Sequence, residues 1–407
     1  MKLSSLKKWI FFYPLIFILS CDSENQQKEN QFTAADNLIE QALRDDLFTG
    51  AVLLIGDRQG VLYEQAYGYA TLYDESLRVV SEPDGMTLDH RFDIASLTKI
   101  FATTYGYMAL QSDGVVNLDA SIAQYLSEFD KEGYRDISIR HLLSHTSGLS
   151  PWFPTYYWLS NHDNILQNIS EMDLNNQPGE ERRYSDLGFI ILGKLLEEIT
   201  DRNFGEYLDE RIYSKLNISS TGFGPLDDTS NVVSTSHGNP FEKRMVYDSN
   251  FGYRIDVDSE NWDEWRTYTL KGEVNDGNAY YSLDGVAGHA GLFSTANDIY
   301  RLMLPVLNNG EFNEQEIFSS QTVEDFLKED KFENGLGWGL SVGSTHRDEN
   351  IETAAGHTGF TGTNFLINRE NGKVYILLTN RQHVGQMQDG NYPDLRELRV
   401  ELSLLIK

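Results

Sequence analysis

The chain has 407 residues and carries 62 acidic against 33 basic side chains, which gives a formal net charge of −29 at pH 7. A surface this acidic repels nucleic acid and anionic lipid, so charge excludes both as partners of the folded body. The length allows one or two domains, with enough apolar sequence for a large core.

The first 20 residues are typical of an export signal, because three lysines precede an apolar run from 9 to 19. This run is too short to span a bilayer comfortably. Cys21 follows it and is the single cysteine of the sequence, so no intramolecular disulfide can form. Residues 18–21 (Ile-Leu-Ser-Cys) are similar to a bacterial lipobox, whose cysteine is lipidated. We therefore expect a lipoprotein signal peptide at 1–20 and lipid attachment at Cys21; the alternative is an ordinary secretory signal with an incidental cysteine.

Polar residues dominate 22–31, and we expect a flexible tether at 21–32. Signal and tether together predict a protein anchored to a membrane by its lipid. We expect the outer membrane, with the body in the periplasm or on the cell surface.

The rest of the chain, 33–407, is expected to form one mixed α/β body. Helical spacing covers 33–47, and two strands are expected at 51–56 and 61–69. Near the other end, strands are expected at 363–367 and 374–379, before a closing helix at 395–406. The two ends could share one antiparallel sheet, while the mostly helical patterns between them indicate a second, helical lobe.

One short stretch, Asp-Ile-Ala-Ser-Leu-Thr-Lys at 93–99, places a serine and a lysine three residues apart at the start of a helical pattern over 97–110. Backbone N–H groups at a helix start favour developing negative charge near Ser96. Lys99 projects to the same side one turn later, where burial and neighbouring groups could lower its pKa enough to let it accept a proton. The alternative is a helix-capping serine with a solvated surface lysine.

Two further stretches accompany this pair. The segment 178–186 (Pro-Gly-Glu-Glu-Arg-Arg-Tyr-Ser-Asp) offers Tyr184 just before an apolar helix at 187–199. The segment 356–362 (Gly-His-Thr-Gly-Phe-Thr-Gly) precedes a predicted strand, with glycines where a substrate could approach the backbone.

The order Ser-x-x-Lys, Tyr-x-Asp, His-Thr-Gly resembles the penicillin-recognising serine hydrolases, a family of class C β-lactamases, low-molecular-weight D,D-peptidases and related esterases. Two auxiliary stretches, 141–149 and 288–296, fit the same family, and the resemblance covers about 33–407. It implies the β-lactamase/transpeptidase-like fold, an α/β (α+β) architecture with an antiparallel sheet flanked by helices plus a mainly helical lobe. It implies no cofactor and no metal.

The resemblance also assigns roles to residues. Ser96 would attack a carbonyl to form an acyl-enzyme, with Lys99 and Tyr184 sharing the proton transfers. Tyr184 needs cationic neighbours to serve as a base, and Lys99 and a protonated His357 are the candidates. The oxyanion hole would be the backbone N–H groups of Ser96 and Phe360. The expected substrate-binding residues are Asp186, His357, Thr358 and Gly359.

Two departures from the β-lactamase pattern affect substrate choice. Asp186 replaces the usual asparagine, so an acceptor stands where an amide donor is common. His357 replaces the usual lysine, and we expect a weaker demand for a substrate carboxylate. Because no glutamate is placed as in class A β-lactamases, efficient antibiotic hydrolysis is not expected.

Two histidine patterns have structural interpretations. His141 and His145 have the spacing of a zinc-protease helix, but the glutamate that should follow the first histidine is absent, so we expect a structural helix and turn. For His289 we favour a structural role over catalysis.

The sequence thus predicts a lipid-anchored serine hydrolase that acts through a Ser96 acyl-enzyme on an ester or amide. The expected substrates are small or polysaccharide-attached esters and peptidoglycan-related peptides. The alternatives are a non-catalytic binding lipoprotein on the same fold and a true β-lactamase, because one fold hosts many functions.

Overall fold

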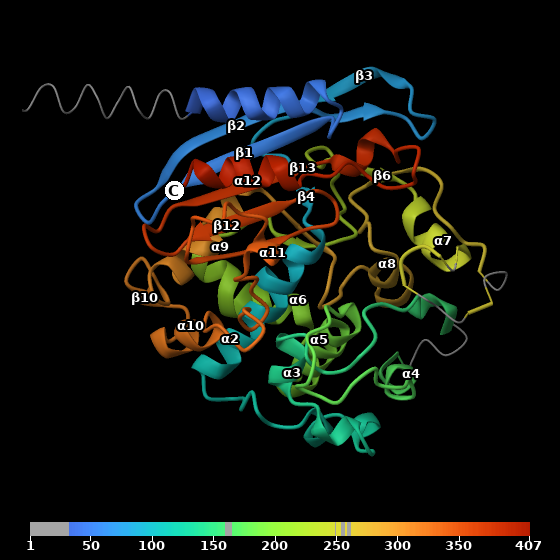
Figure 1. The fold of residues 1–407 in the computed structure, drawn as a ribbon, viewed down its shortest axis with the longest axis vertical. Helices are drawn as coiled ribbons and strands as arrows, with labels where there is room; N and C mark the ends of the chain where they lie inside the picture. Colours follow the sequence, from blue (N-terminus) through green and yellow to red (C-terminus); the bar gives the residue numbers. More distant parts are fainter. Residues whose placement is uncertain (1–31, 159–164, 249, 254–256, 259–261) are drawn as a thin grey trace, which may run out of the picture.

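The computed structural model describes residues 32–158, 165–248, 250–253, 257–258 and 262–407 (Figure 1). The predicted signal peptide, Cys21 and all but the last residue of the predicted tether lie outside these ranges. Within the described part of the chain, no helix combines the length and the apolar character that a membrane crossing needs.

The largest sheet has six antiparallel strands in the order β11-β12-β13-β1-β2-β3. β1 lies at its centre and pairs with β2 on one side and with β13 on the other, so the two ends of the chain share one sheet, as the sequence predicts. The bounds of its strands are β1 Gly50–Gly56, β2 Val61–Tyr73, β3 Val79–Gly85, β11 Ala354–Thr358, β12 Asn364–Asn368 and β13 Val374–Thr379.

Both faces of this sheet are covered, because successive side chains of a strand point to opposite faces. From β1, Ala51 and Leu53 join an apolar cluster with a helix over 32–44 and with α12 (Arg396–Leu404). Val52 and Leu54 join the main core on the other face, where α9 (Ala296–Leu307) packs. This explains why every residue of β1 is buried.

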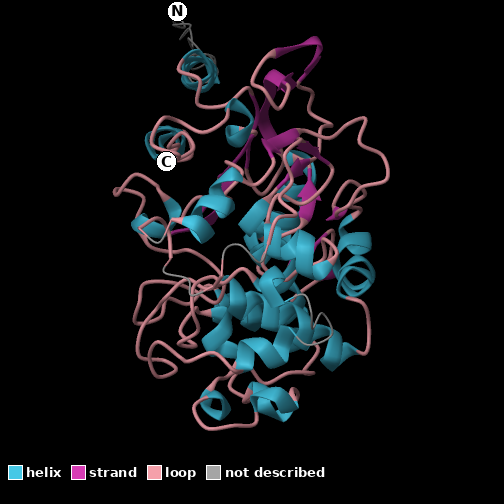
Figure 2. Cartoon of the chain, turned by 90° about the vertical axis from the view of Figure 1, so that its right-hand side faces the viewer, coloured by secondary structure: helices cyan, strands magenta, loops and turns pink. Residues whose placement is uncertain are grey.

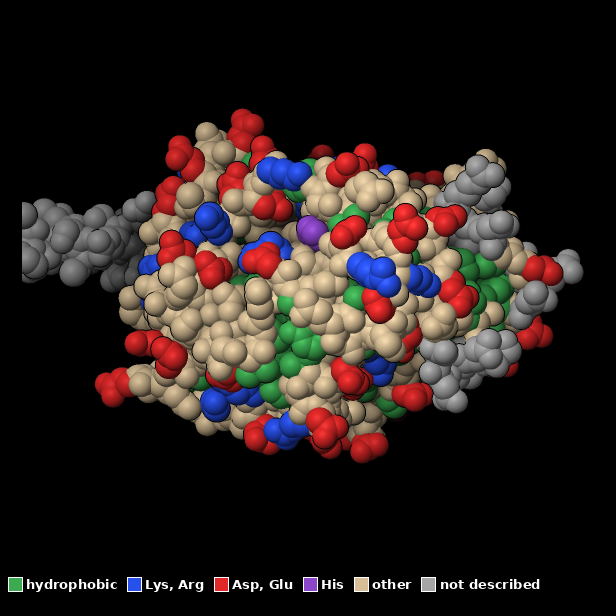
Figure 3. All heavy atoms as spheres, turned by 90° about the horizontal axis from the view of Figure 1, so that it is seen from below, with side chains coloured by type: hydrophobic (Ala, Val, Ile, Leu, Met, Phe, Trp, Pro, Cys, Tyr) green, Lys and Arg blue, Asp and Glu red, His purple; other side chains and the backbone are tan. Residues whose placement is uncertain are grey.

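The remaining helices lie mostly at the other end of the molecule, away from the strands (Figure 2). Their bounds are α2 Tyr105–Ser112, α3 Ile139–Leu143, α4 Ile165–Ser170, α5 Asp186–Thr200, α6 Phe204–Leu208, α7 Pro240–Tyr247, α8 Gly277–Leu283, α10 Ser320–Phe326 and α11 Val342–Thr345. The short strands are β4 Phe92–Asp93, β5 Gly222–Phe223, β6 Ser234–His237, β7 Thr269–Lys271, β8 Leu292–Ser294, β9 Glu311–Phe312 and β10 Gln315–Glu316. The predicted helical lobe is present, and acidic side chains are spread over the face shown in Figure 3, with lysines and arginines among them.

Several elements differ from the prediction. The first helix ends at residue 44 instead of 47, and Phe32 already belongs to it and stacks on the ring of Tyr63. β3 and β11 are additional strands. The predicted helix over 97–110 is divided into a 3₁₀ turn at Ala95–Leu97, a π-helical segment at Lys99–Thr104 and then α2.

Candidate active site

Ser96 lies on a sharp turn between β4 and the π-helical segment. Ala95 has a φ of +47°, a left-handed conformation that is unfavourable for a residue with a Cβ. The Asp93 carboxylate stabilises this turn by accepting hydrogen bonds from the backbone N–H of Ala95 (2.8 Å) and of Asn275 (2.6 Å). The turn therefore leaves the half-buried Ser96 side chain at the cleft.

Lys99 is fully buried and surrounded by three oxygen atoms. Its Nζ donates to Ser96 Oγ at 3.1 Å and to the carbonyl of His289 at 3.0 Å, and it lies 2.7 Å from Asp186 Oδ1. Two hydrogen bonds and one ion pair with a carboxylate are the environment of a charged ammonium group.

The electrostatics agree with this geometry. Burial alone would lower the pKa of Lys99, but the charges of Asp186 and Tyr184 outweigh it and hold the pKa above its ordinary value. The expectation that burial and neighbouring groups together lower the pKa of Lys99 is therefore wrong, because the neighbouring carboxylate of Asp186 raises it. Asp186 begins α5, where a negative charge also suits the helix dipole.

Tyr184 lies directly before α5 and is held by aromatic neighbours. Its ring packs on His145, with 4.4 Å between ring centroids, and lies 6.0 Å from the ring of His357. Its hydroxyl is within hydrogen-bonding reach of Ser96 and Lys99, and burial raises its pKa while Lys99 opposes that rise. The predicted nucleophile, lysine and tyrosine are thus brought together.

Two histidines contact the residues around Tyr184 and Lys99. His145 Nδ1 accepts a hydrogen bond from the backbone N–H of Ser185 at 3.1 Å, which fixes the peptide beside Tyr184. His289 has its ring on Asp276 at 2.8 Å and offers its carbonyl to Lys99. His141 instead caps α3 through Ser138. The structural interpretation of His141 and His289 agrees with these contacts, whereas the contact of His145 with the site was missed.

The His-Thr-Gly segment ends strand β11 and faces the Ser96 turn. Thr361 Oγ1 donates to the carbonyl of Asp93 at 2.8 Å, and Thr363 Oγ1 donates to that of Ile94 at 3.0 Å. A Cβ on Gly359 would lie 2.0 Å from Thr363 Oγ1 and 2.7 Å from the Ile94 carbonyl, so only glycine allows this approach. The turn after β11 is therefore fixed against the Ser96 segment.

His357 is neutral in this environment. Burial, together with the charge of Lys99, lowers its pKa to about 3. Its Nδ1 donates to the carbonyl of Thr358 at 2.8 Å, which leaves Nε2 as an acceptor. The expectation that a protonated His357 assists Tyr184 is wrong, because a buried imidazole next to an ammonium loses its proton.

Ser96 and Tyr184 line a cleft of about 400 Å³, whereas Lys99 and Asp186 are not among its lining residues. Its lining includes Ser96, Tyr184, His357, Thr358, Gly359 and Phe360 together with Arg182, His346, Arg381 and Arg399. The Phe360 carbonyl accepts from Arg381 and from Gln382 Nε2 at 3.2 Å, while its N–H has no hydrogen-bond partner in the described ranges. That free N–H is available as an oxyanion donor.

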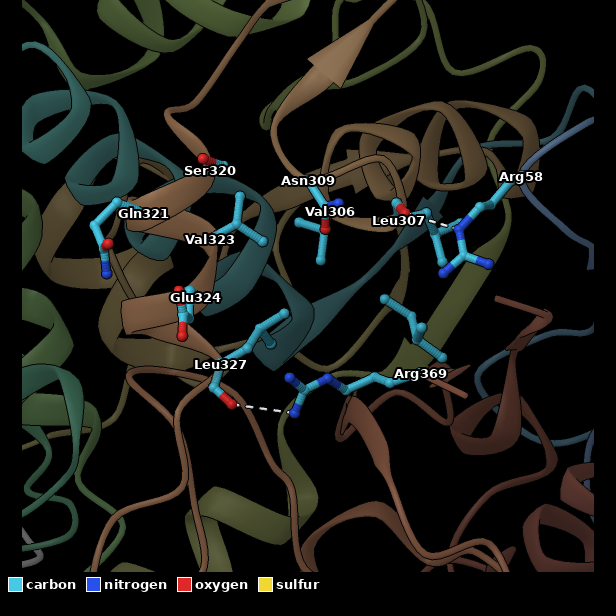
Figure 4. A pocket seen from close by; sticks show the side chains of 11 residues that line it. Arg58, Val306, Leu307, Asn309, Ser320, Gln321, Val323, Glu324, Leu327 and Arg369 are labelled. Atoms are coloured by element: carbon cyan, nitrogen blue, oxygen red, sulfur yellow. Dashed lines mark hydrogen bonds between the residues drawn. The ribbon is translucent and has the colours of Figure 1, made fainter. Parts of the chain in front are cut away.

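The arginines were missed by sequence reasoning, since arginine is usually a surface residue and Arg182 stands in a charged loop. A second cavity of about 420 Å³ lies between α9, α10 and the end of β12 (Figure 4). Arg58 and Arg369 line it, and both bind backbone carbonyls, those of Leu307 and Leu327. None of the predicted site residues lines this second cavity.

Comparison with known proteins shows which family the chain matches. A family model described as "Beta-lactamase" matches residues 35–398. The chain is 31% identical over 381 residues to a protein of Escherichia coli O157:H7 named "Putative D-alanyl-D-alanine carboxypeptidase", covering 88% of this chain and 83% of that one. It is 29% identical over 384 residues to the N-acetylmuramyl-L-alanine amidase of Bacillus subtilis strain 168, covering 88% and 84%.

Solved structures show the same fold. EstCE1, a hydrolase with promiscuous acyltransferase activity, superposes with a TM-score of 0.67 at 20% identity, covering 93% of this chain and 99% of that one. The predicted β-lactamase/transpeptidase-like fold is confirmed. The family match and the E. coli relative together show that the chain belongs to the β-lactamase family of serine hydrolases.

Proposed function

We propose that the protein hydrolyses peptidoglycan-related peptides, with Ser96 as the nucleophile that forms an acyl-enzyme. The observation that carries this proposal is the cleft lined by Ser96, Tyr184 and Phe360, with the Lys99 ammonium donating to Ser96 Oγ at 3.1 Å. The names of the E. coli and B. subtilis relatives, which this chain matches over most of their length, support peptidoglycan as the substrate class.

Tyr184 is the group to which Ser96 gives its proton in this proposal. Lys99 donates to Ser96 Oγ and keeps its own three protons, so it cannot accept another. In this proposal Tyr184 reacts as a phenolate, which the Lys99 ammonium stabilises. As Ser96 Oγ bonds to the substrate carbonyl carbon, its proton moves to that phenolate, and Tyr184 becomes a neutral phenol. The proton then passes to the leaving amine or alcohol, and water attacks the acyl-enzyme with Tyr184 again as the base.

The carbonyl oxygen becomes negative during both attacks. The backbone N–H groups of Ser96 and Phe360 are proposed to bind that oxygen, Ser96 from the first turn of its helix and Phe360 from the turn after β11. Losing one such donor typically costs about 3 kcal/mol of barrier. Thr358, Gly359 and the neutral His357 border the same space and are the proposed contacts for the substrate backbone.

Ester hydrolysis is the second candidate. The neutral His357 at the usual lysine position favours it, because a site without that fixed cation holds an uncharged ester more readily.

D-Alanine release from an N-acylated D-alanyl-D-alanine peptide separates the two candidates. We expect release by the parent protein and none by the Ser96→Ala variant. Turnover of p-nitrophenyl acetate without any D-alanine release would favour the esterase, and release that persists in Ser96→Ala would overturn the proposed nucleophile.

We also propose that Cys21 carries the lipid that anchors the protein at the outer membrane. The support is the lipobox-like sequence 18–21 and the polar residues behind it. Membrane fractionation of cells that express the parent or the Cys21→Ser variant tests this. Retention of Cys21→Ser in the membrane fraction would contradict the proposal.

A further inference from the structure

The second cavity, of about 420 Å³, is separate from the cleft that contains Ser96 (Figure 4). The two share no lining residue. Thr363, just before β12, binds the Ile94 carbonyl close to Ser96, whereas Ile367 and Arg369 at the other end of this strand line the second cavity. A cavity of this volume is large enough for a small organic molecule.

One wall of the cavity is aliphatic. It is formed by five buried residues from α9, α10 and β12, namely Val306, Leu307, Val323, Leu327 and Ile367. Covering such a wall with an apolar group is favourable, because it removes apolar surface from water. A ligand of this cavity therefore needs an apolar part.

Two arginines approach the same cavity from turns of the large sheet. Arg58, between β1 and β2, donates from Nε to the Leu307 carbonyl at 2.9 Å, and Arg369, directly after β12, donates to the Leu327 carbonyl at 3.1 Å. These carbonyls stand at the C-terminal ends of α9 and α10, where a cation is favourable. Each bond uses one of the five N–H donors of a guanidinium. Helix capping thus explains where the arginines lie and leaves further donors for a ligand.

The charges around the cavity do not balance. Its charged lining residues are Arg58, Arg369 and Glu324, and Figure 4 shows Glu324 on the α10 side, across from Arg58. Neither arginine forms an ion pair with a carboxylate of the described residues, and burial lowers the pKa of Arg369 with no neighbouring acid to oppose it. Two positive charges against one negative charge leave an excess of one, which a singly charged anion would balance.

We propose that this second cavity binds a carboxylate that carries an aliphatic or aromatic body. The apolar body covers the five aliphatic residues, and the carboxylate accepts hydrogen bonds from Arg369 and Arg58, as guanidinium groups favour. A phosphate monoester fits less well, because its second negative charge would be left beside Glu324. The site is independent of the proposed reaction, so the ligand binds whether or not Ser96 is acylated.

Calorimetry with 4-phenylbutyrate, 4-phenylbutanamide and acetate tests the chemistry of the site. The parent should bind 4-phenylbutyrate about 10-fold or more tightly than the other two, because the amide lacks the charge and acetate lacks the apolar body. Equal affinities for 4-phenylbutyrate and its amide would refute the proposal, and this comparison needs no variant. Tighter binding of 4-phenylbutyl phosphate than of 4-phenylbutyrate would refute the assignment to a singly charged anion.

The variants Arg369→Gln and Arg58→Gln should each reduce the preference for the carboxylate over the amide by about 10-fold. Arg301→Gln is the matched control, since Arg301 is an exposed arginine of α9 that also binds a backbone carbonyl, that of Asn217 at 3.1 Å, but does not line the cavity. A preference that survives in both folded cavity variants would overturn the role of the arginines.

Photolabelling shows where the carboxylate binds. A trifluoromethyl-diazirinyl benzoate, irradiated with the protein and followed by peptide mass spectrometry, should label peptides from 306–327 or 367–369. We expect the same labelling in the parent and in Ser96→Ala, and its suppression by 4-phenylbutyrate. Labelling confined to the cleft that contains Ser96, for example to 356–362, would overturn the second site.

Discussion

At the scale of single residues, the partner of Lys99 determines what this lysine can do. A lysine buried alone tends to lose its proton and become a base, but Lys99 lies 2.7 Å from a carboxylate and remains an ammonium. In the proposed mechanism its role is therefore electrostatic, and Tyr184 is the group that moves the proton. In this proposal, Asp186 decides whether Lys99 acts as a base or as a fixed positive charge.

The Asp186→Asn variant tests that division of roles. Without the carboxylate, burial dominates and the pKa of Lys99 falls, so Lys99 loses its charge at lower pH. We expect the alkaline limb of the kcat/KM profile to move to lower pH by about one unit or more, the size of effect that an adjacent opposite charge has on a pKa. A pH–rate profile identical to that of the parent would show that Asp186 does not control Lys99.

A second prediction concerns His357 and the pH dependence of the free energy of unfolding. Its pKa is lowered from 6.5 to about 3 in the folded protein, so below pH 6.5 the unfolded chain binds a proton that the folded chain does not. Stability therefore falls as pH decreases from 6.5 toward 3. In His357→Gln, the loss of unfolding free energy over this range should be smaller by at most about 1.4 kcal/mol per pH unit. Urea unfolding at several pH values measures it, and parallel curves for the two proteins would contradict it.

At the scale of elements, the site depends on how β11 meets the Ser96 turn. The contact is made by a glycine and by threonine hydroxyls that bind the carbonyls of Asp93 and Ile94. These groups set the position of the Phe360 N–H relative to Ser96.

Gly359→Ala should disturb that contact. The new Cβ would lie 2.7 Å from the Ile94 carbonyl, so β11 must move away from Ser96. Because one misplaced oxyanion donor costs about 3 kcal/mol, we expect kcat to fall by about 100-fold or more. Gly60→Ala is the control, since its Cβ meets no atom within 4 Å and activity should be retained. Equal kcat values for Gly359→Ala and the parent would show that β11 does not position the donor.

The strands that could be predicted are those with continuous apolar runs between turn residues, such as β1 and β13. β11 could not be predicted, because Ala-Ala-Gly-His-Thr has neither alternation nor bulk, and its pairing with β12 is what makes it a strand. The π-helical segment after Ser96 was also missed, since its apolar spacing suits an ordinary helix equally well. In the site, the motif residues were predicted, whereas the Lys99–Asp186 pair and the arginines that line the cleft depend on tertiary contacts between distant segments.

At the scale of the whole molecule, a sheet built from both chain ends lies at one end and a lobe of helices from the middle of the chain at the other (Figures 1 and 2). The cleft that contains Ser96 is lined by residues of both parts, among them His357 from β11 and Tyr184 before α5. The helix over 32–44 and α12 cover the outer face of the sheet, opposite the main core. These two helices pack on the sheet, and Arg399 of α12 is the one residue of theirs that lines the cleft.

Ile39→Ala should therefore separate stability from activity. Ile39 is fully buried between the first helix and the sheet, and truncating it should cost about 2–5 kcal/mol of unfolding free energy. We expect kcat/KM at 25 °C to remain within about twofold, because the cleft lies on the other side of the sheet. Glu40→Ala, at an exposed neighbouring position, is the control for both quantities. A loss of activity by folded Ile39→Ala would show that the outer layer acts on the site.

The central claim is that Ser96 becomes acylated. The most direct measurement is rapid mixing with p-nitrophenyl acetate, followed by intact and peptide mass spectrometry. We predict a burst of p-nitrophenol equal to the enzyme concentration, with the acetyl group on the peptide that contains Ser96, and neither signal in Ser96→Ala. An undiminished burst in Ser96→Ala, or an acetyl group carried by another residue during turnover, would contradict the account.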